Sequence, residues 1–286
     1  MSKVRIGVVG PGIIWKNAHR PSLEPFGEQV EITAFSASSE RTRREVEQTY
    51  PGTPFYPDYH DLVASPDVDW VLVLTPIALN ASVAQAALEA GKNVFLEKPM
   101  ARSLAEGEML VRLADEAGKS LFVLEQFAYS SYIDTVEQVI RSGEIGEILM
   151  YDQVQNEIYD ANSFDATAWR TQADFPLGRL FDGGHHPIAR LGRLFGQPVS
   201  VYATGRKVRP NYGEYDHVLM LLEHENGVRG SFGWGSVLSG RKDYFHIRGT
   251  KGILSLERGQ TVVDLNDGHA RTIPHPRERD YAAMWR

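Results

Sequence analysis

The stretch Val4-Arg5-Ile6-Gly7-Val8-Val9-Gly10-Pro11-Gly12 decides the fold of the first part of the chain. Its first six residues are mostly apolar and predict a buried strand, and the two glycines that follow predict a tight turn. Residues 14–23 are then expected to form a helix. A strand that passes through a glycine turn into a helix is the opening unit of many α/β domains that bind nucleotides.

The alternation of strand and helix continues to about residue 142. Strands are predicted at residues 30–35, 70–74, 94–96 and 121–124, and helices at residues 40–50, 80–90, 104–117 and 133–142. Strands that alternate with helices in this way form a parallel sheet covered by helices on both faces.

The pattern changes near Gly146. Strands are predicted at residues 148–156, 199–207, 217–223, 228–232, 244–248, 253–256 and 261–265, and one helix at about residues 186–195. Turn signals such as Glu225-Asn226-Gly227 separate several of these strands. We therefore expect an α/β protein of two domains, 1–125 and 126–286. The second domain should hold a large, mostly antiparallel open sheet with helices on one face.

The composition is typical of a globular protein. Of the 286 residues 42% are hydrophobic, and the net charge of −7 argues against a nucleic-acid surface. The absence of cysteine excludes disulfides and thiol catalysis. No apolar run approaches the roughly 18 residues that span a bilayer, and the N-terminus lacks a signal-peptide pattern. A cytoplasmic location without membrane or nucleic-acid partners is expected.

The glycine turn predicts a site for the phosphates of a dinucleotide. Gly10 permits the tight turn, and Gly12 lets backbone N–H groups approach a pyrophosphate at the start of the helix. Ile13 and Ile14 follow at the same place. The third position of the usual fingerprint holds Trp15, which implies either a wider spacing between helix and strand or an indole near the phosphates. A turn with a purely structural role is the alternative.

The end of the second predicted strand indicates which dinucleotide binds. Ala37 occupies the position where an acidic residue usually holds the ribose diol of NAD. Ser38 and Ser39 are small donors and Arg41 is near them, so a 2′-phosphate would meet no repelling carboxylate. We therefore expect NADP as the preferred cofactor, with NAD as the alternative. The arginines of this segment could instead simply solvate the start of a helix.

Polar residues also follow the strands at the carboxyl edge of the parallel sheet, where open α/β sheets bind ligands. The strand at 94–96 leads into Glu97-Lys98-Pro99, and the strand at 70–74 leads into Thr75-Pro76. Lys98 can polarise a substrate oxygen there or remain solvated and structural. Asn80 is expected either to line the cofactor path or to cap the next helix.

The segment Asp182-Gly183-Gly184-His185-His186 predicts an acid–base pair. If His186 lies in the first turn of a helix, Asp182 precedes it by about one turn, and a carboxylate can orient an imidazole for general acid–base catalysis. Asp182 as a plain helix cap is one alternative. Zinc binding is another, but adjacent histidines should point in different directions, so no metal site is predicted.

Short motifs that carry these residues are distributed along the whole chain. They are Gly10-Pro11-Gly12, Thr75-Pro76, Ala90-Gly91-Lys92, Glu97-Lys98-Pro99, Ser142-Gly143-Glu144-Ile145-Gly146-Glu147, Trp169-Arg170, Asp182-x-x-x-His186 and Gly249-Thr250-x-Gly252. In this order they resemble the glucose–fructose oxidoreductase, inositol dehydrogenase and rhizopine-catabolism (Gfo/Idh/MocA) family. The Glu-Lys-Pro and Asp-x-x-x-His motifs together are specific, whereas the glycine turn alone is not.

The resemblance implies a Rossmann domain followed by an α/β domain, and NAD(P)-dependent oxidation of a sugar or cyclitol hydroxyl or the reverse reduction. It matches the family's catalytic lysine, aspartate and histidine to Lys98, Asp182 and His186. It also implies a homodimer or homotetramer formed through the open sheet, and a cis peptide bond before Pro99.

Two sets of contacts follow for the bound molecules. The expected cofactor contacts are Gly10, Gly12, Ile13, Ile14, Ser38, Ser39, Arg41, Thr75, Pro76, Asn80, Glu97, Lys98, Gln126, Trp169 and Arg170. The expected substrate contacts are Lys98, Tyr129, Tyr159, Asp182, His185 and His186. The Trp169-Arg170 pair is equally compatible with a packed aromatic beside a surface arginine.

The chain departs from the family pattern at Trp15, Ala37, Asn80, Ala128 and Ala189. These departures leave the substrate more open than the chemistry. Family members usually continue through a final helix beyond the position of Arg286, so the sequence is expected to be either a short member or a truncated one.

The predicted function is hydride transfer between a nicotinamide and a secondary alcohol or ketone of a sugar or cyclitol, with Lys98 and His186 assisting proton transfer. Three alternatives stay open. They are a non-catalytic NAD(P)-binding sensor, an enzyme that keeps its cofactor bound and couples two sugars, and an enzyme with another hydride acceptor, such as a linear tetrapyrrole. The presence of Lys98, Asp182 and His186 together argues against the sensor.

Overall fold

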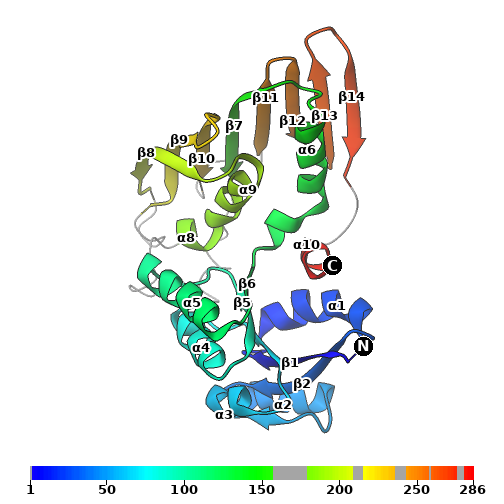
Figure 1. Cartoon of the computed structure of the whole chain (residues 1–286), viewed down its shortest axis with the longest axis vertical. Helices are drawn as coiled ribbons and strands as arrows, with labels where there is room; N and C mark the ends of the chain where they lie inside the picture. The colour runs from blue at the N-terminus through cyan, green and yellow to red at the C-terminus, as the bar shows by residue number, and fades with distance from the viewer. Residues whose placement is uncertain (1, 157–178, 209–214, 236–242, 258, 276–279) are drawn as a thin grey trace. The chain divides into compact units, whose positions relative to one another are not determined.

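Two separate sheets organise the chain, and each belongs to its own unit (Figure 1). The computed structural model describes residues 2–156, 179–208, 215–235, 243–257, 259–275 and 280–286. The first unit comprises Met1–Glu125 together with Met284–Arg286, and the second comprises Gln126–Ala283. The α/β class predicted from the sequence is confirmed.

The first sheet is parallel and has the strand order β3-β2-β1-β4-β5-β6. Its strands are β1 (Val4–Val9), β2 (Val30–Ser36), β3 (Phe55–Tyr56), β4 (Trp70–Val73), β5 (Asn93–Glu97) and β6 (Leu121–Leu124). The chain builds outward from β1 to β3 and then returns to the other side of β1 with β4. Open parallel sheets bind ligands at such a switch point, outside the carboxyl ends of the strands.

Helical segments cover this sheet on both faces, as the sequence predicted. They are η1 (Trp15–His19), α1 (Arg20–Leu23), η2 (Glu24–Phe26), α2 (Glu40–Thr49), α3 (Tyr59–Ala64), α4 (Ile77–Glu89) and α5 (Leu104–Ala117). One apolar cluster joins Leu62 of α3, Val83 of α4 and Leu110 of α5 to alternate strand residues such as Ala34. The neighbouring Phe35 points to the opposite face, where Trp15 meets it edge-on with ring centroids 5.9 Å apart.

The second sheet has the order β14-β13-β12-β11-β7-β10-β9-β8, and every pairing is antiparallel except that of β7 with β10. Its strands are β7 (Ile148–Asn156), β8 (Pro198–Arg206), β9 (His217–His224), β10 (Arg229–Gly235), β11 (Tyr244–Gly249), β12 (Gly252–Glu257), β13 (Gln260–Leu265) and β14 (Ala270–Pro274). The prediction of a large, mostly antiparallel sheet is confirmed.

The helical segments of the second unit are η3 (Gln126–Tyr129), α6 (Ser131–Ser142), α8 (Arg179–Gly183), α9 (His185–Phe195) and α10 (Asp280–Trp285), whose last residues group with the first unit. The apolar sides of α6 and α9 share one core with the inner face of the sheet. Tyr151 of β7 stacks on Phe195 of α9 with ring centroids 4.8 Å apart. None of the helices in the described part of the chain combines the length and apolar character of a membrane span.

A buried hydrogen-bond chain anchors Tyr151 inside this core. The Nδ1–H of His224 donates to the carbonyl of Gly196 at 2.8 Å, so the Nε2 atom of His224 accepts from the Tyr151 hydroxyl at 3.1 Å. Burial raises the pKa of Tyr151, because the phenolate would lose its hydration. Tyr151 therefore holds the inner face of β7 against α9 and β9.

Candidate functional site

The carboxyl edge of the first sheet holds Thr75, Pro76 and Lys98. Strands β4 and β5 are paired neighbours, with Val73 opposite Leu96, so the segments that follow them leave the sheet side by side. Glu97 ends β5, Lys98 follows it partly buried, and the Lys98–Pro99 peptide bond is cis. The lysine thus stands at the kind of edge where ligands bind.

Asn80 ties these two segments together. The hydroxyl of Thr75 donates to its Oδ1 atom at 2.8 Å, and its Nδ2 atom donates to the carbonyls of Glu97 at 3.2 Å and Pro99 at 3.0 Å. Those two carbonyls stand immediately before and after Lys98. Asn80 is 1% exposed and lies inside α4, so the alternative that it caps this helix is wrong.

A second buried hydrogen-bond chain holds the side chain of Glu97. The indole N–H of Trp285 donates to Nδ1 of His19 at 3.2 Å, and Nε2 of His19 lies 3.2 Å from Oε1 of Glu97. Because an indole nitrogen can only donate, Nδ1 of His19 accepts and Nε2 carries the hydrogen that is given to the carboxylate. His19 is 0% exposed and Glu97 is 5% exposed. The residue before Lys98 is therefore held through both its carbonyl and its carboxylate.

His19 and Trp285 could not be predicted as partners of Glu97 from the sequence. His19 is separated from Glu97 by 78 positions and from Trp285 by 266, so no local pattern joins them. The one available signal was that His19 lies one helical turn after Trp15, on the helix that follows the glycine turn.

The two glycines of the turn differ in whether the fold itself has room for a side chain at their positions. Gly10 has φ +80°, and a Cβ there would lie 2.9 Å from the carbonyl oxygen of Leu74. A Cβ on Gly12 would meet only the carbonyl oxygen of Gly10, at 3.9 Å. The packing of the chain therefore needs a glycine at position 10 but not at position 12. An open cradle at Gly12 fits a group that approaches the backbone from outside, as the pyrophosphate of a dinucleotide does.

Trp15 is built into the core of the first unit. It is 2% exposed and begins η1, which is a π-helical turn in place of the predicted α-helix. Extra width in a helix at this point accommodates a large side chain where the usual fingerprint has a small one. The indole lies against Phe35 and Tyr50.

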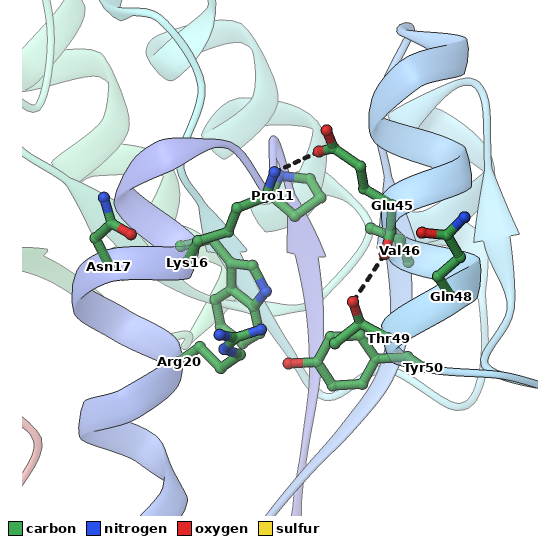
Figure 2. A pocket seen from close by; sticks show the side chains of 10 residues that line it. Pro11, Lys16, Asn17, Arg20, Glu45, Val46, Gln48, Thr49 and Tyr50 are labelled. Atoms are coloured by element: carbon green, nitrogen blue, oxygen red, sulfur yellow. Dashed lines mark hydrogen bonds and ion pairs between the residues drawn. The ribbon is translucent and has the colours of Figure 1, made fainter.

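A cavity of about 290 Å³ lies between η1 and α2, with Pro11 and Trp15 in its wall (Figure 2). The Lys16 ammonium is paired with the Glu45 carboxylate across it. Glu45 also accepts from Nε of Arg41 at 3.1 Å, and these two cations hold the pKa of its carboxyl below the usual value. Two cations therefore converge on one carboxylate beside the glycine turn.

The end of β2 carries hydroxyl groups and a nearby guanidinium. Ser39 caps α2, since its Oγ accepts from the N–H of Thr42 at 3.4 Å. Ser38 is exposed, and the Arg41 side chain is 87% exposed while it bonds Glu45. An ion pair of this kind on a helix surface contributes little to stability. The guanidinium of Arg41 can therefore leave Glu45 and bind a more highly charged anion at a small cost in free energy.

The second unit positions Asp182 in α8 and His186 in α9. Asp182 is 2% exposed and His186 is 8% exposed. Between them the N–H of Gly184 donates to the carbonyl of Leu180 at 2.7 Å, and a Cβ on Gly184 would lie 2.5 Å from that oxygen. The junction is thus almost helical, and the two side chains are one turn apart. Gly184 is the N-cap residue of α9 and has no side chain that could cap it.

The rings of the adjacent histidines lie close together. Their centroids are 4.1 Å apart, so the expectation that they point in different directions is wrong. The Nδ1–H of His185 donates to the carbonyl of Phe181 at 2.8 Å. Phe127 of η3 meets the ring of His186 edge-on, with centroids 4.7 Å apart. Both imidazoles are thereby held by groups of the second unit.

The remaining predicted contacts fall into three groups. Ile13 is 73% exposed beside Gly12 and Ile14 is partly buried. In the second unit Tyr129 is 40% exposed and Gln126 is buried, and its Oε1 atom accepts no hydrogen bond from any described residue. The predicted contacts Tyr159, Trp169 and Arg170 lie outside the described residues.

Two family models match the chain. Residues 4–125 match the oxidoreductase family with an NAD-binding Rossmann fold, and residues 133–255 match the Gfo/Idh/MocA C-terminal domain. The chain belongs to the Gfo/Idh/MocA family. Its first unit is accordingly an NAD(P)-binding Rossmann domain of an oxidoreductase family, and the open cradle at Gly12 agrees with this.

Relatives in this family include proteins of known and unknown activity. An uncharacterized protein of Saccharomyces cerevisiae, YMR315W, is 28% identical over 271 residues, which cover 93% of this chain and 76% of that protein. The scyllo-inositol 2-dehydrogenase (NADP(+)) IolW of Bacillus subtilis is 28% identical over 246 residues, covering 86% of this chain and 66% of that enzyme. An oxidoreductase of Thermotoga maritima has a TM-score of 0.91 at 27% identity, with 99% of this chain and 86% of that chain covered.

The contrast between the two glycines predicts opposite effects of the same substitution. Gly12→Ala should leave thermal unfolding unchanged but weaken NADPH binding by about tenfold or more, which is ~1.4 kcal/mol, because the new methyl occupies the pyrophosphate's approach. Gly10→Ala should lower stability by ~1–3 kcal/mol, because alanine is strained at positive φ. Nucleotide fluorescence titration and thermal denaturation measure the two effects. Equal loss of binding at equal stability in both variants would contradict the assignment.

Proposed function

We propose that the protein is an NAD(P)-dependent dehydrogenase that transfers a hydride between the nicotinamide and a secondary alcohol or ketone of a sugar or cyclitol. The observation that carries the proposal is Lys98 at the carboxyl edge of the Rossmann sheet, with the carbonyls on either side of it held by Asn80. The similarity to IolW, an enzyme that by its name oxidises scyllo-inositol, supports the substrate class.

The proposed mechanism divides the work among three side chains. The bound dinucleotide supplies the ring that accepts a hydride from the substrate carbon or returns one to it. Lys98 donates a hydrogen bond to the oxygen on that carbon and stabilises its developing negative charge. In the oxidative direction His186 takes the hydroxyl proton as the C–H bond breaks and the C=O bond forms. Asp182 orients His186 or binds a neighbouring hydroxyl.

NADP is proposed as the preferred cofactor. Support comes from the end of β2, where no carboxylate stands at residues 36–39, all of them described, and where Ser38 and Arg41 are exposed. The start of α2 adds the partial positive charge of a helix N-terminus. Lys16 is a further cation nearby, since it shares Glu45 with Arg41.

The cofactor proposal predicts a preference that direct titration measures. NADPH should bind about tenfold or more tightly than NADH, because the 2′-phosphate gains charge-assisted hydrogen bonds. Arg41→Met should reduce that ratio, whereas Arg43→Met, which removes an arginine paired with Glu47 on the same helix, should not. A preference for NADH in the unaltered protein would overturn the proposal.

A homodimer or homotetramer is proposed to form through the outer face of the second sheet. Along this face Tyr202 of β8 lies opposite Leu221 of β9, and both are exposed, at 69% and 58%. Leu219 is 49% exposed on the same face. Contiguous exposed apolar side chains of this kind mark association surfaces. A monomeric mass by light scattering would contradict this.

The central role proposed for Lys98 predicts a selective loss of turnover. Lys98→Met should lower kcat by about 10²-fold or more, because the developing charge on the substrate oxygen loses its donor. NADPH binding should remain measurable in this variant by direct titration. Absorbance of the reduced nicotinamide with a panel of sugars and cyclitols measures turnover. Lys3→Met, which removes an exposed lysine just before β1, is the matched control. Near-normal turnover of Lys98→Met would refute the role.

A further inference from the structure

The second unit contains a cavity of about 570 Å³, and none of the residues that line it has a role in the proposed mechanism. Its wall combines Phe127 of η3, Tyr132 of α6 and Arg190 of α9 with side chains of strands β7, β11 and β12. Cavities of roughly 300–1,000 Å³ are the usual size for small-molecule sites. The polar groups inside it indicate what kind of molecule fits.

Arg190 brings a positive charge into this cavity. Its Nη1 atom donates to the Tyr132 hydroxyl at 2.6 Å and its Nη2 atom donates to Oε1 of Gln155 at 2.9 Å. Its Nε atom is buried and has no acceptor among the described residues. Both of its partners are neutral, so they fix the direction of the guanidinium without balancing its charge. A guanidinium with an open N–H edge is suited to a carboxylate.

Gln153 adds an unsatisfied acceptor beside it. Gln153 and Gln155 are two positions apart on β7, so both side chains lie on the inner face of the sheet. Gln153 is 4% exposed, and its Oε1 atom is buried without a donor among the described residues. Buried polar atoms in native proteins are normally hydrogen-bonded. A ligand hydroxyl would supply the missing donor.

Among the acidic and basic groups of the cavity wall, Arg190 carries the charge inside the cavity. Asp243 and Glu257 are exposed at the rim, where Asp243 accepts from the N–H of Asn156 at 2.6 Å and Glu257 accepts from Nε2 of Gln260 at 3.0 Å. Burial lowers the pKa of His275, so its imidazole is neutral at neutral pH. The interior of the cavity therefore favours a single negative charge.

The cavity begins beside the proposed acid–base residue. Arg190 follows His186 by four positions on α9, so the two side chains share one face of the helix, with Cβ atoms ~5–6 Å apart. Phe127 contacts the ring of His186 edge-on and also forms part of the cavity wall. The cavity wall therefore includes a ring that directly contacts the imidazole of His186.

We infer that this cavity binds the carboxylate of a hydroxylated acid of sugar size, with Arg190 as the residue that selects the negative charge. The carboxylate accepts from the Nε edge of Arg190, and one hydroxyl donates to Oε1 of Gln153. Another hydroxyl reaches His186. The inference rests on the proposed function, because it names the substrate class of that dehydrogenase as sugar acids. A neutral sugar would leave the guanidinium unbalanced, and a dianionic phosphate ester would exceed its single charge.

Binding of sodium D-glucuronate tests the inference directly, with D-glucose and D-glucose 6-phosphate as comparison ligands. Calorimetric titration of the protein saturated with NADPH should give a Kd for glucuronate about tenfold or more below that for the other two. Arg190→Met should remove this preference. Arg229→Met, which removes a largely exposed arginine paired with Glu223, should leave it intact. Equal binding of the three ligands, tighter binding of the phosphate, or no effect of Arg190→Met would overturn the inference.

A second variant keeps the arginine and its hydrogen bonds in place. Gln153→Glu puts a carboxylate beside Arg190, so it should compete with glucuronate and weaken its binding by about tenfold or more. Unchanged binding in this variant would also overturn the inference. Turnover distinguishes this outcome from failure of the proposed function. Glucuronate binding that depends on Arg190, with no nicotinamide absorbance change for any sugar, refutes the dehydrogenase but not the anion site. Turnover of neutral sugars, with glucuronate binding that does not depend on Arg190, refutes the anion site but not the dehydrogenase.

Discussion

One side-chain amide connects the parts of the first unit on which the proposed chemistry depends. Asn80 accepts from Thr75 after β4 and donates to the carbonyls of Glu97 and Pro99 around Lys98. A buried amide whose partners come from two strand ends holds those ends together, and its removal would take one donor away from each of two buried carbonyls. The position of Lys98 is therefore set by the sheet and not by the flexible lysine stem itself.

Further hydrogen bonds and strand pairing hold the segments that Asn80 connects. Trp285 and His19 hold the carboxylate of Glu97, and the pairing of β4 with β5 holds its backbone. In the second unit the near-helical junction at Gly184 sets Asp182 one turn from His186. Each unit thus fixes its own share of the proposed acid–base groups by short-range packing. Precise placement of this kind is what proximity and electrostatic stabilisation require of an active site.

Much of this architecture follows from local sequence signals. The helix Leu104–Ala117 was predicted residue for residue because both of its ends are marked. Ser103 caps its start, with its Oγ accepting from the N–H of Glu106 at 3.2 Å, and Gly118 ends it at φ +59°. Strands buried on both faces, such as β4, were equally clear from their apolar runs. Two of the missed elements lack such marks: β3 has two residues, and β14 is a polar edge strand.

The candidate functional site could be predicted only in part from the sequence, and the reason is physical. The sequence placed Lys98 after a recognisable strand and His186 at the start of a recognisable helix, and the resemblance to the family matched these two residues and Asp182 to its catalytic residues. The π-helical turn at Trp15 depends on how one indole packs against Phe35, which no periodicity expresses. The bonds of His19 and Arg190 join residues far apart in the chain, so their roles emerge only from tertiary packing.

The measurement that tests the account most directly is turnover per folded molecule in Asn80→Ala, compared with Asn93→Ala at the other end of β5. Asn93 is also hydrogen-bonded, with its Oδ1 accepting from the N–H of Ser120 at 2.9 Å, so both variants lose amide contacts. We expect kcat to fall by about tenfold or more in Asn80→Ala but not in Asn93→Ala, because a misplacement of Lys98 by ~1 Å slows the reaction strongly. KM for NADPH should change little. Equal kcat in both variants, at equal folded fraction, would contradict the account.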